Sequence, residues 1–161
     1  MEYLDCTIRP WEVADRLAVA KVIGTVLAEY GLGWEPEAAD RDVLEIEKYY
    51  LETGGEFWTL LNKAGEVIGS AGYHPISRSV GAVEMRKMYL LKAYRGRGLG
   101  RYVLDKLEEA IKSRGFREIW IETASVLKEA VQLYEKSGYV ASSGVETLRC
   151  DRVYVKKLDC D

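Results

Sequence analysis

Hydrophobic positions in the first third of the chain recur with the period of a helix. Residues 12–30 contain no proline, and apolar or small residues lie three or four positions apart, as on one face of a helix. The residues of this face are Val13, Leu17, Ala20, Gly24 and Leu27. A second helix is predicted over residues 39–51, with Asp42 on its solvent-facing side. Its apolar face consists of Val43, Ile46 and Tyr50.

The pattern then changes to that of β-strands. Three apolar runs separated by turns predict an antiparallel meander over residues 56–61, 67–73 and 82–90. An amphipathic helix follows from residue 99 to about residue 112, with apolar side chains every four positions. The apolar run 119–121 completes a strand–helix–strand unit, whose short connections predict a right-handed parallel crossover. Shorter elements are predicted at residues 6–9 (strand), 127–136 (helix), 139–140 and 153–155 (strands).

These elements predict one α+β domain that spans residues 1–161. Its central sheet is mixed but mostly antiparallel, is flanked by about four helices, and contains one parallel crossover. A chain of 161 residues is long enough for one hydrophobic core and too short for two comfortable domains.

Composition narrows the class of protein. The formal net charge of −3 disfavours a general nucleic-acid binder, which usually carries a basic excess. No apolar run approaches the ~20 residues needed to span a bilayer, and the first residues lack the features of a signal peptide. Cys6, Cys150 and Cys160 have no metal-ligand spacing. We therefore expect a cytoplasmic protein with unpaired thiols, no metal, and no nucleic-acid or membrane partner.

A turn rich in glycine and arginine follows the third meander strand. Gly96, Gly98 and Gly100 allow the backbone to bend tightly and to approach a ligand closely. The amides of the first turn of the following helix have no partner within that helix, so they can bind an anion. Positive side chains surround the turn: Lys92, Arg95, Arg97 and Arg101. The stretch therefore has the chemistry of a pyrophosphate site.

Three known glycine motifs compete for this turn. A mononucleotide P-loop needs lysine and then serine or threonine after its last glycine, whereas Arg101 and Tyr102 stand there. A dinucleotide fingerprint that begins at Gly96 would need a third glycine where Arg101 stands. Residues 95–100 do fit the pattern Arg/Gln-x-x-Gly-x-Gly/Ala. On these residues alone, an ordinary turn with solvated arginines remains an alternative.

Three stretches together carry a resemblance to a known family: Glu84-Met85-Arg86-Lys87-Met88-Tyr89-Leu90, the arginine–glycine turn, and Ala130-Val131-Gln132-Leu133-Tyr134-Glu135-Lys136-Ser137-Gly138-Tyr139. With them, residues 82–140 resemble the acetyl-CoA-binding core of the GNAT superfamily of N-acyltransferases. The resemblance implies acetyl-CoA as cosubstrate, with the pantetheine arm along one strand and the pyrophosphate on the turn. The coenzyme-binding residues that it implies are Met88, Tyr89, Leu90, Arg95, Gly96, Arg97, Gly98, Leu99, Gly100 and Arg101.

The resemblance also suggests catalytic groups. Tyr134 matches the tyrosine that many members place near the coenzyme sulfur, which suggests a general acid. A lysine-like amine is mostly protonated near neutral pH, because its pKa is about 10.4, so a base is expected to matter more. Glu84 is the first candidate for this base; Glu122, His74 and a water chain are alternatives. Leu127 departs from the family, since many members have asparagine there.

The acceptor is not determined by these residues. A small-molecule amine and a peptide amine both fit, and a homodimer through the terminal strands is compatible with the resemblance. Of the aromatic residues that could shape an acceptor pocket, Trp34 is expected to be exposed. The leading hypothesis is acetyl transfer to a primary amine by direct attack in a ternary complex. The alternatives are a non-catalytic acyl-CoA-binding or regulatory module on the same fold, and a dinucleotide oxidoreductase, which the missing third glycine disfavours.

Overall fold

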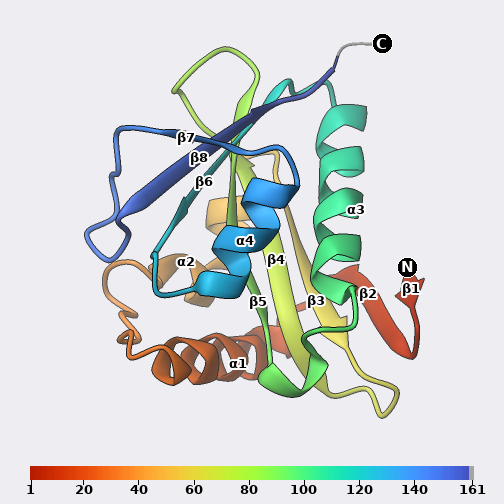
Figure 1. The fold of residues 1–161 in the computed structure, drawn as a ribbon. Helices are drawn as coiled ribbons and strands as arrows, with labels where there is room; N and C mark the ends of the chain where they lie inside the picture. Colours follow the sequence, from red (N-terminus) through yellow and green to blue (C-terminus); the bar gives the residue numbers. More distant parts are fainter. Residues whose placement is uncertain (160–161) are drawn as a thin grey trace.

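The computed structural model describes residues 1–159 and contains one eight-stranded sheet (Figure 1). The strand order is β1-β2-β3-β4-β5-β6-β8-β7. Only β5 and β6 run parallel; every other neighbouring pair is antiparallel. The strands are β1 (Glu2–Tyr3), β2 (Cys6–Pro10), β3 (Glu56–Leu61), β4 (Val67–Pro75), β5 (Ala82–Leu90), β6 (Glu118–Thr123), β7 (Val140–Ser142) and β8 (Arg152–Lys157).

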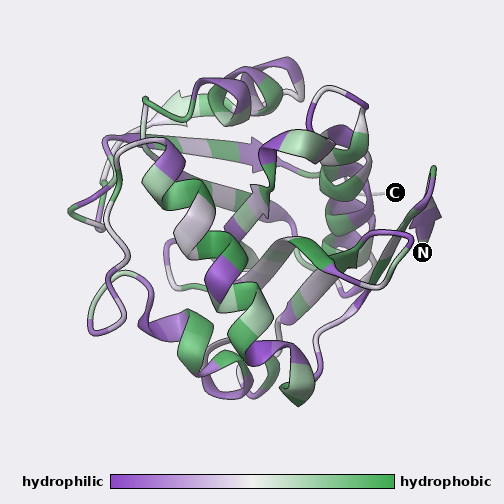
Figure 2. Cartoon of the chain, turned by 90° about the horizontal axis from the view of Figure 1, so that it is seen from below, coloured by the Kyte–Doolittle hydropathy of each residue, from purple (hydrophilic) through white to green (hydrophobic). Residues whose placement is uncertain are grey.

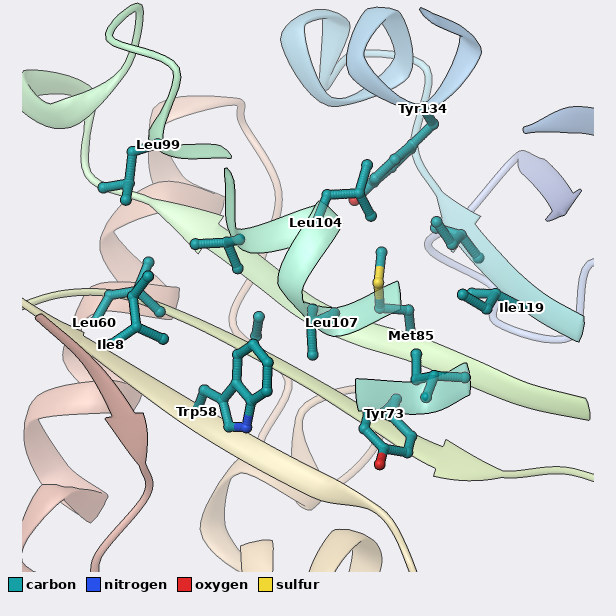
Figure 3. Packing of buried hydrophobic residues seen from close by; sticks show 14 of the residues in the cluster. Ile8, Trp58, Leu60, Tyr73, Met85, Leu99, Leu104, Leu107, Ile119 and Tyr134 are labelled. Atoms are coloured by element: carbon teal, nitrogen blue, oxygen red, sulfur yellow. The ribbon is translucent and has the colours of Figure 1, made fainter. Parts of the chain in front are cut away.

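Helices cover both faces of the sheet and create two apolar cores. Their bounds are α1 (Arg16–Glu29), α2 (Arg41–Leu44), α3 (Leu99–Ser113) and α4 (Lys128–Lys136), with short helices η1 (Val13–Asp15), η2 (Glu47–Leu51) and η3 (Lys92–Tyr94). One core joins α3 and α4 to the strands, and Figure 3 shows Leu104, Met85 and Tyr134 converging there. The other core joins α1, α2 and η2 to the opposite face. Figure 2 shows hydrophobic and hydrophilic residues side by side along the helices, as this layering requires.

Most predicted elements are confirmed, including the α+β class and the parallel crossover. Strands β3 and β5 have the predicted bounds, whereas the two-residue strand β1 was not expected. The continuous helix over residues 39–51 was wrong, because the chain there forms the short helix α2 and the π-helical turn η2. Among the described residues, no helix is both long and apolar enough to cross a membrane.

Three predictions of side-chain exposure in the two predicted helices were also wrong. Val13 of η1 and Leu17 of α1 are 67% and 80% exposed, and the buried face of α1 consists of Val19, Val22, Ile23, Val26 and Leu27. Asp42 is buried rather than solvent-facing, although Val43, Ile46 and Tyr50 lie in the core as expected. Apolar residues occupy most positions of α1 and lie on every side of the helix, so the period could not select the buried face.

The parallel pairing of β5 with β6 is short, and beyond it the two strands separate. Its ladder extends only from Ala82 opposite Glu118 to Glu84 opposite Trp120. Beyond Glu84, β5 continues to Leu90 without a partner on that side, so its backbone polar groups face the space between the two strands. The crossover from β5 to β6 runs through α3, and the glycine-rich turn before α3 lies at the carboxyl end of β5. This opening defines the candidate site.

Candidate active site

A cavity of about 430 Å³ fills the opening between β5 and β6. Its walls come from segments far apart in the sequence: α1, the whole of β5 from Glu84 to Leu90, the turn after β5, the end of β6, α4, and the loop between β7 and β8. The predicted acid, the first predicted base and most of the predicted coenzyme-binding residues line this one cavity. The fold therefore brings the two halves of the predicted site together.

The glycine-rich turn forms one end of the cavity. Gly96 and Gly98 have φ angles of +76° and +84°, a region that residues with side chains rarely adopt. Gly98 is the N-cap of α3 and no side chain caps this helix, so its first amides remain available to an anion. Gly100 and Arg101 also line the cavity, whereas Leu99 is buried in the core.

Two arginines of the turn have roles that the sequence did not reveal. Arg95 lines the cavity, but its guanidinium donates to both carboxylate oxygens of Glu29 in α1, at 2.5 and 3.0 Å. Its positive charge is therefore largely compensated. Arg97 is exposed, and its carbonyl accepts a hydrogen bond of 2.9 Å from the Tyr3 hydroxyl. The unexpected strand β1 thus supports the turn from outside, helped by stacking of Tyr3 on Tyr102.

The strand residues Met88, Tyr89 and Leu90 form the long wall of the cavity. They lie beyond the last residue that pairs with β6, so no strand pairs with their backbone on the cavity side, although the Leu90 carbonyl oxygen accepts a hydrogen bond of 2.9 Å from Nε of Arg95. Burial raises the pKa of Tyr89 to about 12, and the phenol stays neutral in the physiological range. An extended ligand can hydrogen-bond to such a free strand edge in the manner of an added strand.

Tyr134 faces the cavity from α4. Its side chain is buried and reaches from the helix toward the sheet (Figure 3). Within residues 1–159 its hydroxyl has no hydrogen-bond partner, although the ring lies beside Tyr139 and Tyr154. Burial, and secondarily the nearby phenol of Tyr89, raise the pKa of Tyr134 well above its usual value. The cavity thus contains a neutral phenol whose hydroxyl is free to donate.

Glu84 enters the cavity from β5, on the sheet face opposite α4. One of its carboxylate oxygens lies 3.3 Å from Nε of Arg86. Burial raises the pKa of Glu84, and Arg86 only partly offsets this effect. Glu84 also borders a second cavity of about 380 Å³, lined by Ile76, Ser77, Arg78 and Glu146. A carboxylate of raised basicity therefore lies where two cavities meet.

The alternative bases have other partners. One carboxylate oxygen of Glu122 accepts hydrogen bonds from the amides of Glu146 and Thr147, at 2.8 and 3.0 Å. Its other oxygen lies 3.7 Å from Arg78, so Glu122 holds the β7–β8 loop even though it lines the cavity. His74 lies at the end of β4 outside the cavity wall, its Nδ1 3.1 Å from the carbonyl oxygen of Pro75.

Cys150 lines the cavity, a position that the sequence did not indicate. Burial raises the pKa of its thiol to about 11, so the thiol is protonated near neutral pH and is a poor nucleophile. Cys6 is buried away from the cavity, and both thiols are free. Cys160 lies outside the described residues. Within residues 1–159, no cluster of three or more His, Cys, Asp or Glu side chains is arranged to hold a metal ion.

A buried ionic network closes the Cys150 end of the site. Asp40, in the loop between α1 and α2, accepts hydrogen bonds of 2.6 and 2.8 Å from Arg149 of the β7–β8 loop. It also accepts one of 2.9 Å from Lys87 of β5. Trp34 of the same loop is half-buried against the second core rather than exposed, because this network draws the loop onto the sheet. No local sequence pattern pointed to these partners.

Comparisons with known proteins agree with this geometry. Residues 20–139 match the Acetyltransferase (GNAT) family. The uncharacterized N-acetyltransferase YjgM of Escherichia coli is 36% identical over 135 residues, which cover 82% of this chain and 80% of YjgM. This chain belongs to the GNAT family of acetyltransferases.

Solved structures show the same GNAT fold. An acetyltransferase of the GNAT family from Staphylococcus aureus Mu50 superposes with a TM-score of 0.88 at 21% identity, covering 96% of this chain and 99% of the other. A GNAT phosphinothricin acetyltransferase from Sinorhizobium meliloti, solved in complex with acetyl-CoA, gives 0.76 at 18% identity, covering 96% and 89%. These identities establish the fold. Membership of the family establishes an acetyltransferase.

Proposed function

We propose that this GNAT acetyltransferase transfers an acetyl group from acetyl-CoA to a primary amine by direct attack in a ternary complex. One observation carries the proposal: a single cavity joins the glycine-rich turn, the free edge of β5, the Tyr134 hydroxyl and the Glu84 carboxylate. These are the four elements that the reaction needs: an anion site, a backbone edge for the arm, a hydrogen-bond donor and a base.

The coenzyme binds along the cavity from the turn to the Tyr134 end. Its pyrophosphate contacts the amides of residues 95–101, and the exposed guanidiniums of Arg97 and Arg101 add positive charge. The pantetheine arm pairs with the free edge of β5 at Met88–Leu90. A backbone N–H of this edge donates to the thioester carbonyl and stabilises the negative charge that develops on its oxygen during attack.

The acceptor amine approaches from the Glu84 side and loses a proton there. A free amine of pKa about 10.4 is nucleophilic in about one molecule in a thousand at neutral pH, a handicap of about 4 kcal/mol. Glu84 accepts this proton, and its raised pKa makes it a better base than a solvated carboxylate. The amine nitrogen then forms a bond to the thioester carbon, which gives a tetrahedral intermediate.

Collapse of that intermediate breaks the carbon–sulfur bond and releases the coenzyme as a thiolate. The Tyr134 hydroxyl donates a proton to this sulfur, and the second proton that the attacking nitrogen loses as the amide forms returns the phenolate to the phenol. The products are the N-acetylated amine, the coenzyme thiol and protonated Glu84, which then releases its proton to solvent. Cys150 takes no part, because its protonated thiol is not a nucleophile and direct attack needs no acyl-enzyme. These steps require only a primary amine at the Glu84 side, so both a small-molecule amine and a peptide amine fit as acceptors.

Calorimetry and a thiol-release assay test the proposal together. Acetyl-CoA is titrated into the protein, and coenzyme release is then followed over a panel of polyamines, amino acids, aminoglycosides and peptides. Saturable binding and amine-dependent thiol release are expected. Binding without release by any amine would indicate the non-catalytic module, and absence of binding would refute the coenzyme site. A homodimer and a cytoplasmic location are further proposals, tested by light scattering and cell fractionation.

A further inference from the structure

Lys87 has a backbone conformation that residues with side chains rarely adopt. Its φ is +54°, in the left-handed region where Cβ crowds the neighbouring carbonyl. The cause is one extra residue in β5. Pairing with β4 passes from Gly72–Arg86 to Ser70–Tyr89, so one residue of β4 faces two residues of β5. This is a β-bulge, which bends a strand and re-aims the residues around it.

The bulge places two consecutive side chains on the same face of the sheet. Arg86 and Lys87 both donate to the carbonyl oxygen of Ala39, at 3.2 and 2.8 Å. In a regular strand neighbouring side chains point to opposite faces. Lys87 would then point toward the core that contains Met85 and Met88. The side chain of Lys87 therefore points to this face only because its backbone has the bulged conformation.

An ion pair stabilises this bulged conformation of Lys87. The Lys87 side chain is 4% exposed, and its Nζ lies 2.9 Å from Asp40 and 3.5 Å from Asp42. A buried ammonium is costly unless it is paired in this way. Burial alone would raise the pKa of Asp40, but Arg149 and Lys87 lower it to about 2, so Asp40 remains ionised. Strand β5 is thereby tied to both loops that border the Cys150 end of the cavity.

The bulge lies directly before the backbone that faces the coenzyme. The last residue of β5 that pairs with β6 is Glu84, and Met88–Leu90 follow Lys87 without a partner on the cavity side. The direction of their N–H groups depends on the bulge. We propose that Lys87 is a positioning residue for acetyl transfer: its ion pair with Asp40 holds the β5 bulge and aims the backbone of Met88–Leu90 at the thioester carbonyl. This inference rests on the proposed function.

The first test separates positioning from stability. Lys87→Met and Asp40→Asn remove the ion pair, and Asp15→Asn is the matched control. Asp15 is also buried, with hydrogen bonds of 2.7 and 2.9 Å from Arg9, but it does not line the cavity. With an amine that the wild type acetylates, we expect kcat to fall about tenfold or more in the first two variants, with KM for acetyl-CoA within about twofold. Asp15→Asn is expected to lower the Tm and to keep kcat.

The second test isolates the backbone. Lys87→Ala and Lys87→Gly both lack the ammonium, but glycine adopts a positive φ without strain whereas alanine does not. If the bulge positions the thioester, Lys87→Gly should have a kcat several times that of Lys87→Ala. Equal kcat in these two variants would overturn the inference, as would wild-type kcat in Lys87→Met.

The third test needs no acceptor. Infrared spectroscopy of acetyl-CoA labelled with ¹³C at the thioester carbonyl reports the hydrogen bonding of that group in the bound state. We expect the carbonyl stretch to move to lower frequency on binding to the wild type and to move less on binding to Lys87→Met. An equal shift in both proteins would refute the positioning role of Lys87 and would leave the proposed function intact. Failure of the wild type to bind acetyl-CoA refutes the proposed function itself.

Discussion

Replacing Tyr134 with phenylalanine removes a hydroxyl whose only proposed partner is the coenzyme sulfur. The ring remains, and it packs between Tyr139 and Tyr154 as before. Because the hydroxyl has no hydrogen-bond partner within residues 1–159, its loss leaves no protein group unpaired. We therefore expect the free energy of unfolding of Tyr134→Phe to stay within about 0.5 kcal/mol of the wild type.

The size of the kinetic effect follows from the acidity of the two groups. The coenzyme thiol has a pKa near 8.5, whereas burial raises the pKa of Tyr134 above the usual value near 10. Complete transfer of the phenol proton is thus uphill, and most of the stabilisation comes from the hydrogen bond to the developing thiolate. Such a charge-assisted bond contributes about 1.5–3 kcal/mol, so kcat should fall roughly 10- to 150-fold.

Tyr154→Phe is the matched control. Its ring centroid lies 6.4 Å from that of Tyr134, but its hydroxyl is bonded to Glu135 at 3.0 Å and the residue does not line the cavity. This variant should lose about 1 kcal/mol of stability and keep kcat. The measurements are thiol release at saturating substrates and urea unfolding. Full kcat in Tyr134→Phe, or equal kcat losses in both variants, would refute the assignment of the acid.

Three further predictions follow from other parts of the molecule. For Glu84→Gln we expect kcat/KM near pH 7 to fall about 100-fold. Because burial raises the Glu84 pKa above 4.5, the wild-type kcat/KM should fall as the pH drops below that raised pKa and should be level above it, whereas kcat/KM of the variant should keep rising toward the amine pKa. Identical pH profiles would argue against this base. Gly98→Ala and Gly65→Ala place a side chain at φ +84° and +82°, so each should destabilise the fold by about 1–2 kcal/mol, but calorimetry should show weaker acetyl-CoA binding, by about tenfold or more, only for Gly98→Ala. Leu107→Ala, in the α3 core (Figure 3), should cost about 2–5 kcal/mol in thermal unfolding while acetyl-CoA affinity at 25 °C is retained; a loss below about 1 kcal/mol would contradict the packing of this core.

The parts of the fold that were predictable have local signals. Strand β5, the turn and α3 follow one another with changes of period and three glycines that only a tight turn explains. The prediction of one helix over residues 39–51 was wrong because a shared apolar face does not require a continuous helix. Val43, Ile46 and Tyr50 reach the same core from α2 and η2.

The ionic network was not predictable from local pattern. Asp42 was predicted to face solvent because a carboxylate is normally solvated. In the structure its buried partners offset the free-energy cost of burying this charge. For Asp40, the partners Lys87 and Arg149 lie 47 and 109 positions away in the sequence. No periodicity connects such distant residues.

One signal of the bulge was present in the sequence. In a regular strand the residues that face the α3 core would alternate without interruption. In β5 they are Val83, Met85, Met88 and Leu90, so the alternation slips by one position at Arg86 and Lys87. Reading that slip would have predicted the bulge, although not the carboxylates that hold Lys87 in place.

The central claim is that the opening between β5 and β6 binds acetyl-CoA in one orientation. A crystal structure of the complex tests it most directly. We predict the pyrophosphate against the amides of residues 95–101, the pantetheine arm along Met88–Leu90, and the sulfur within hydrogen-bond reach of the Tyr134 hydroxyl. A coenzyme bound elsewhere, or bound here with its sulfur remote from Tyr134 and its thioester remote from Glu84, would contradict the account.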